Sequence, residues 1–115
     1  MKRLFAVAAT LLAFLSPVAA AFNKVENFPF SNISATTAAF TLRGGNYGVT
    51  CHATFGGGNV VLQRLATDAA SWVNVITAMT ADGYASANLP SGSYRLAITT
   101  ATGVYCDVVA TVTTQ

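Results

Sequence analysis

The sequence of 115 residues has few charged side chains: Asp, Glu, Lys and Arg together make up 9% of it, whereas about a quarter is usual in soluble domains. The formal charge is +2, but Lys2 and Arg3 supply the excess, and basic and acidic residues balance in the rest of the chain. A neutral domain offers no basic surface, so neither nucleic acid nor an anionic membrane is expected as a partner. Its polar surface must come from Thr, Ser and Asn. Such a surface suits a protein that packs against copies of itself or another assembly, and a Thr-rich β-domain alone also explains it.

Residue types that carry catalysis or bind metals are also scarce, with one histidine and two cysteines. A zinc site needs three or four protein ligands, and a calcium loop needs several closely spaced acids. His52 directly follows Cys51, so on a strand their side chains point to opposite faces, which excludes a simple Cys–His dyad. The serine-hydrolase elbow is missing, and the glycines at 56–58 lack the Lys-Ser/Thr ending of a phosphate loop. The sequence thus predicts no enzyme, metal or cofactor, with His52 on the surface and Asp68 and Asp82 in turns.

The first 21 residues have the order of a secretory signal peptide. Lys2 and Arg3 precede the apolar run 4–15, and a small-residue cleavage site ends at Ala21. This run is the only stretch that predicts a helix, and it is too short for an ordinary transmembrane span. If the chain is cleaved after Ala21, we expect the remaining domain to have no membrane as a partner. Two other interpretations stay open: an uncleaved anchor, or a start codon assigned upstream of the true one.

Residues 22–34 have weak periodicity and predict an extended apolar arm ahead of the domain. Its apolar side chains are Phe22, Phe28, Phe30 and Ile33, arranged around a proline. Such an arm either packs along its own domain or reaches a neighbouring molecule.

Residues 35–115 predict a single antiparallel β-sandwich of about seven strands, either jelly-roll or immunoglobulin-like. Apolar residues recur with a period of two, and turn residues recur about every ten positions, as in half-buried strands of an all-β domain. The expected strands are 37–43, 47–55, 59–65, 71–79, 84–89, 93–99 and 104–112. The expected core contains Phe40, Leu42, Val49, Leu62, Leu96, Ile98 and Val108.

The only two cysteines, Cys51 and Cys106, each lie in the middle of an expected strand on its inward face. In an oxidising compartment such a pair favours a disulfide, and the alternative is two separate buried thiols. In either state we expect the two Cα atoms within about 7 Å of each other.

The aromatic residues permit two interpretations. A carbohydrate-binding platform is one, and core packing with cross-strand pairs is the more frequent one. The residues concerned are Trp72, Tyr47, Tyr84, Tyr94 and Tyr105.

Several short motifs occur in order along residues 21–113. A Gly-Gly pair precedes Leu62-Gln63-Arg64-Leu65, and Asp68 and Trp72-Val73 follow. Thr80-Ala81-Asp82-Gly83 and then Leu89-Pro90-Ser91-Gly92-Ser93-Tyr94-Arg95 complete the set. In these motifs the chain resembles small β-sandwich proteins that tailed bacteriophages and prophages encode, usually beside virion structural genes.

This resemblance implies a non-enzymatic virion component, such as a head decoration or fibre-like protein, that binds itself, the major capsid protein or another virion protein. No catalytic residue is carried over by the resemblance. The leader departs from the family, because virion proteins assemble in the cytoplasm and need none. The alternative function is a secreted or periplasmic β-sandwich module that binds carbohydrate or another surface ligand.

Overall fold

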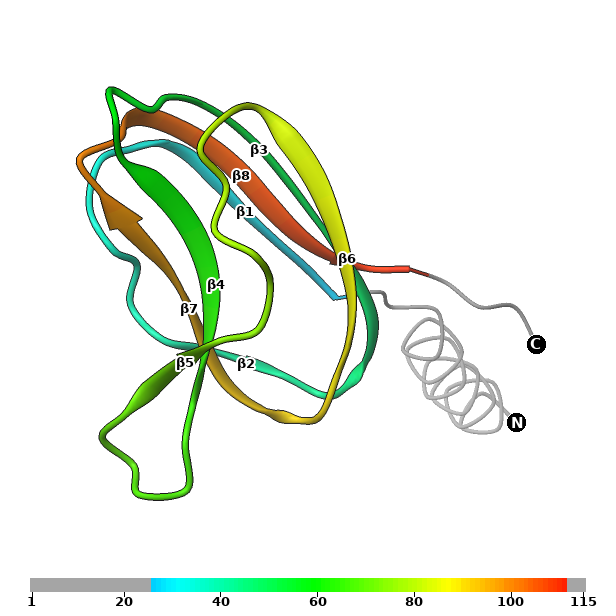
Figure 1. Cartoon of the computed structure of the whole chain (residues 1–115). Coiled ribbons are helices and arrows are strands. Elements are labelled where there is room, and N and C mark those ends of the chain that lie inside the picture. Colours follow the sequence, from blue (N-terminus) through cyan, green and yellow to red (C-terminus); the bar gives the residue numbers. More distant parts are fainter. Residues whose placement is uncertain (1–25, 112–115) are drawn as a thin grey trace, which may run out of the picture.

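The computed structural model describes residues 26–111 (Figure 1). The leader helix expected within 1–21 and Phe22 therefore lie outside the described residues. Every regular element in the described part is a strand, which confirms the all-β class, and no helix there could cross a membrane. The eight strands are β1 (Asn27–Ile33), β2 (Phe40–Leu42), β3 (Gly45–Thr54), β4 (Asn59–Leu65), β5 (Trp72–Asn74), β6 (Gly83–Leu89), β7 (Gly92–Thr99) and β8 (Thr102–Ala110).

The strands form two antiparallel sheets of four strands each. Sheet A has the order β1-β8-β3-β6, and sheet B has the order β2-β7-β4-β5. The pairs are β1 with β8, β2 with β7, β3 with β6 and β4 with β5, and β3–β8 and β4–β7 contacts complete the sheets. Only β4 and β5 are consecutive strands of one sheet, so every other connection passes from one sheet to the other (Figure 1).

The two sheets share one hydrophobic core. Period-two alternation directs Val49 and Val108 inward from sheet A, and Leu62 and Leu96 inward from sheet B, and all four are at most 1% exposed. Burial of one such side chain contributes roughly 1.5–3 kcal/mol. Of the expected core, Leu42, Val49, Leu62, Leu96 and Val108 are fully buried, whereas Phe40 and Ile98 are half-buried at its margin.

The segment expected as an arm differs most from the prediction, because residues 27–33 form strand β1 at an edge of sheet A. Phe28 and Phe30 pack against the core and contact Phe40: the Phe28 ring stacks on it with centroids 4.9 Å apart, and the Phe30 ring is tilted to it with centroids 5.5 Å apart. A register shift after Phe30 disturbs the alternation before Ile33, which explains the weak periodicity of the sequence. Phe28, Phe30 and Ile33 thus pack on their own domain.

Strand β5 is much shorter than the expected strand at 71–79. After Asn74 the chain keeps two contacts with β4, since the Val75 N–H donates to the Leu62 carbonyl at 2.9 Å and Met79 forms a bridge with Val60. The chain then leaves sheet B, because its next strand, β6, belongs to sheet A. Regular pairing with β4 therefore ends at Asn74, before the chain crosses to sheet A.

Cys51 and Cys106 form a disulfide between the adjacent strands β3 and β8. They lie directly opposite each other, their Cα atoms are 4.2 Å apart, and both side chains face the core. The expected proximity is confirmed. The bond links the two central strands of sheet A to each other, not sheet A to sheet B.

Candidate functional site

The outer face of sheet A carries the most exposed aromatic side chains of the described residues. Tyr84 is 63% exposed and Tyr105 is 48% exposed. They lie on this face because side chains alternate along a strand, and the buried Cys106 of β8 and the core-packed Ala87 of β6 are directed to the opposite, inward face. Aromatic side chains at such positions can contact a partner.

The Tyr84 ring lies flat against the sheet because Gly48, on the neighbouring strand β3, has no side chain at that place. A Cβ atom built on Gly48 would lie 2.8 Å from Tyr84 Oη and 2.9 Å from its Cε1, so the phenol ring lies directly over Gly48. This cross-strand packing buries the glycine backbone and compensates for its missing side chain. The same contact fixes the orientation of the exposed Tyr84 ring through van der Waals packing.

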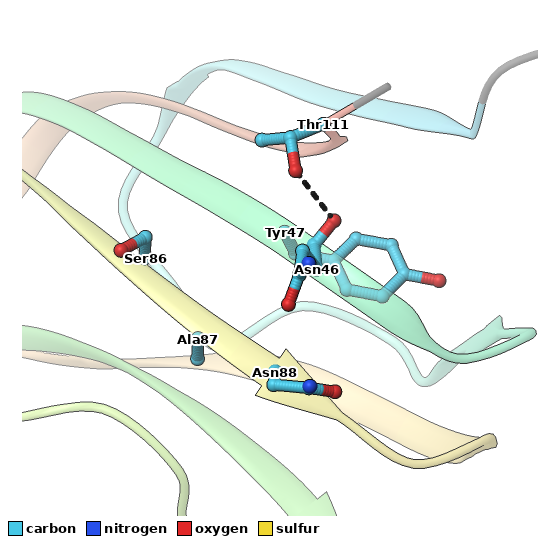
Figure 2. A pocket seen from close by; sticks show the side chains of 6 residues that line it. All are labelled: Asn46, Tyr47, Ser86, Ala87, Asn88 and Thr111. Carbon is cyan, nitrogen blue, oxygen red and sulfur yellow. Dashed lines mark hydrogen bonds between the residues drawn. The ribbon is translucent and has the colours of Figure 1, made fainter. Parts of the chain in front are cut away.

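A shallow hollow of about 390 Å³ lies on the same face, beside β6 (Figure 2). Asn46 of β3 and Asn88 of β6 are register partners there, and Ser86 and Thr111 add hydroxyl groups. The Thr111 hydroxyl donates to the Asn46 carbonyl at 3.2 Å. Within residues 26–111 the side chains of Asn46, Ser86 and Asn88 make no hydrogen bond, so their amide and hydroxyl groups can bind a polar ligand or partner.

His52 and Asp82 form a hydrogen-bonded pair at the far end of β6. His52 Nδ1 lies 2.6 Å from Asp82 Oδ2, and Asp82 Oδ1 accepts the Ala53 N–H at 3.1 Å. The hydrogen bond with His52, followed by the one from Ala53, lowers the pKa of the Asp82 carboxyl below its usual value. Both side chains are more than half exposed, so solvent screens the pair and it adds little stability.

The pair of His52 and Asp82 has limited chemistry of its own. An aspartate on Nδ1 orients a histidine as a general base, but covalent catalysis also needs a nucleophile within reach of the other ring nitrogen. Cys51 is bonded to Cys106 and faces the core. Among the described residues, no three His, Cys, Asp or Glu side chains cluster closely enough to hold a metal ion.

The five aromatic residues considered as a platform do not share one face. Tyr47 and Tyr94 are fully buried. Trp72 lies on sheet B, and the Arg95 guanidinium covers its ring at 4.5 Å from the centroid. Only Tyr84 and Tyr105 remain together, on the outer face of sheet A.

No family model, curated protein or solved structure matches this chain. Its function is therefore inferred from its own geometry.

Two features of the outer face were not found from the sequence. His52 and Asp82 are thirty positions apart, and only the pairing of β3 with β6 brings the turn at Asp82 beside His52. The contact of Tyr84 with Gly48 follows from the same pairing. A glycine within one alternating strand and an exposed tyrosine in another were the available signals, but they identify a contact only when the strands are known to be neighbours.

Proposed function

We propose that this chain is a non-enzymatic structural subunit of a tailed-phage or prophage virion, a head decoration or fibre-like protein that acts by self-association or by docking to the capsid. One observation carries the proposal: β1 pairs with β8, β2 with β7, β3 with β6 and β4 with β5. A long antiparallel ribbon that rolls up produces this nested pairing. On this basis we assign the domain to the jelly-roll β-sandwiches and not to the seven-stranded immunoglobulin type.

Jelly rolls are frequent in viral capsid domains, and they also occur in lectins, so the fold supports the proposal by analogy. The composition supports it independently. Because only 9% of the residues are charged, copies of the chain repel one another weakly. The disulfide between the central strands of sheet A stabilises the folded domain, which suits a subunit whose contribution is geometric.

The test is to find where the native chain resides. The strain that carries the gene is induced, phage particles are purified on a density gradient, and the chain is quantified by mass spectrometry against the major capsid protein. We expect a fixed copy number per particle that survives repeated banding. A host periplasmic protein followed in the same fractions is the control for contamination. Recovery of the chain in the periplasm or medium, with particles that lack it, would refute the proposal.

A secreted or periplasmic binding module is the second candidate, and two observations favour it. The Cys51–Cys106 disulfide is typical of proteins in oxidising compartments. The hollow at Asn46 and Asn88 presents neutral hydrogen-bonding groups beside the flat ring of Tyr84, as a neutral saccharide requires. Titration with neutral oligosaccharides, monitored by NMR, tests it: resonances of Asn46 and Asn88 should shift, and Asn88→Ala should abolish the shift.

A further inference from the structure

The four outermost strands of the two sheets differ in how well their open edges are protected. An unpaired strand edge is a template for pairing with another chain, and proteins usually block it with short strands, proline, charge or bulges. Strand β1 contains Pro29, a register shift and the left-handed residue Asn32 (φ 53°). Strands β2 and β5 have only three residues each.

Strand β6 has none of these devices. Its seven residues, Gly83–Leu89, contain no proline and no charged side chain, and they pair with β3 in continuous register. Within residues 26–111, no backbone hydrogen bond reaches β6 from the side opposite β3. This edge is therefore open along its whole length in the described part of the chain.

The register shows which backbone groups point outward from that edge. In an antiparallel pair, opposed Cα atoms lie about 4.5 Å apart where the residues do not hydrogen-bond each other, and about 5.5 Å apart where they do. The distance of 4.2 Å between Cys51 and Cys106 identifies a pair that is not hydrogen-bonded. Cys51 thus directs its N–H and C=O away from β8 and toward β6.

Two observed hydrogen bonds agree with this assignment. The N–H of Ala53, which has the same parity as Cys51, donates to Asp82 on the β6 side. The C=O of Asn46, which has the opposite parity, accepts the Thr111 N–H on the β8 side at 2.9 Å. Since β6 pairs with β3 without a shift, the odd-numbered residues of β6 bond to β3, and Tyr84, Ser86 and Asn88 present their N–H and C=O groups at the open edge.

We infer that two copies of this chain associate through β6, edge to edge and antiparallel, with Ser86 facing Ser86 across a two-fold axis. In this register Tyr84 of each copy faces Asn88 of the other, and all three pairs are of the hydrogen-bonded kind. The two A sheets then form one continuous eight-stranded sheet. The inference rests on the self-association half of the proposed function and specifies its contact.

A second copy fits this edge better than an unrelated strand for two reasons. The edge is self-complementary, because the outward-facing groups are spaced symmetrically about Ser86, as a two-fold interface requires. Strand β6 is also uncharged, so no repulsion opposes its pairing with itself.

A charged side chain at position 86 tests the inference, because the two copies of this residue face each other at the two-fold axis and their like charges would repel. Purified full-length protein with its disulfide intact is examined by analytical ultracentrifugation over a wide concentration range. We expect wild type to dimerise and Ser86→Lys and Ser86→Glu each to weaken dimerisation at least 100-fold. An equimolar mixture of these two variants should dimerise again. Thr41→Lys is the matched control, since Thr41 is also exposed on an edge strand, β2, and should leave dimerisation unchanged.

Amide hydrogen exchange gives a readout that needs no variant. The amides of Tyr84, Ser86 and Asn88 should become protected as the protein concentration rises, whereas those of Ala85 and Ala87 should be protected throughout. A strictly monomeric wild type, or concentration-independent exchange at all three residues, would overturn the inference while leaving capsid docking to be judged by the particle fractions. A wild-type dimer that Ser86→Lys leaves intact would overturn the β6 contact but not self-association.

Discussion

Removal of the Cys51–Cys106 bond should destabilise the domain strongly. The two cysteines are 55 positions apart, and the chain-entropy model gives about 4 kcal/mol for closing a loop of that length in the unfolded chain. Domains of this size are stable by about 5–15 kcal/mol, so the bond supplies a large share of the total. In melting temperature, such a loss corresponds to a decrease of about 15–30 °C.

The assay is urea unfolding of the oxidised protein, the reduced protein and the double variant Cys51→Ala/Cys106→Ala, combined with thiol titration of the native state. Reduction and double substitution should both lower the free energy of unfolding by a similar amount. A reductant added to the double variant should change nothing, which controls for side effects of the reagent. A loss below about 1 kcal/mol on reduction, in a protein whose native state titrates no free thiol, would refute the reasoning from loop closure.

Three further predictions concern single residues. Leu96→Ala should cost about 2–5 kcal/mol in urea unfolding, because Leu96 is fully buried in the core, and a change below about 0.5 kcal/mol would contradict its placement. Tyr47→Phe should cost about 1.5–3 kcal/mol in the same assay, because the buried phenol donates to the Glu26 carboxylate; a variant as stable as wild type would exclude that bond. The Asp68 carboxyl should titrate by NMR with a pKa of about 2, because the Ser71 N–H and hydroxyl and the Ala70 N–H donate to it. The stability it contributes is then fully present above its ordinary pKa of 3.8 and lost as the pH falls through about 2, and a midpoint near 3.8 would contradict these contacts.

The strands that the sequence predicted best are those with a strict alternation between a buried and a solvent-facing side. The observed bounds of β4 are the predicted ones, and β3 and β8 begin within two residues of the prediction. In these strands the pattern of side chains along the strand reports burial directly. Cys51 and Cys106 were predictable as neighbours because both lie on inward faces of such strands.

The remaining features depend on pairing between distant segments. Strand β1 carries a proline and a register shift, so its place beside β8 cannot be seen in its own pattern. The apolar residues at 75–79 resemble a continuation of β5, but regular pairing ends at Asn74, and only Val75 and Met79 keep backbone hydrogen bonds to β4. The outer-face contacts of Tyr84 and His52 require the register of β3 with β6, which local sequence does not encode.

The pairing of β1 with β8 has a consequence for how the chain acquires its structure. Asn27 pairs with Val109, so β1, the first strand of the described chain, forms its backbone hydrogen bonds in the sheet only after β8, the last strand, is present. Contacts between such distant residues give a high contact order, and proteins of this type fold in milliseconds to seconds, not microseconds. On a ribosome, sheet A cannot close until nearly the whole domain has emerged. Until then the apolar side of β1 stays uncovered, and a chaperone that binds extended apolar segments would find its target there.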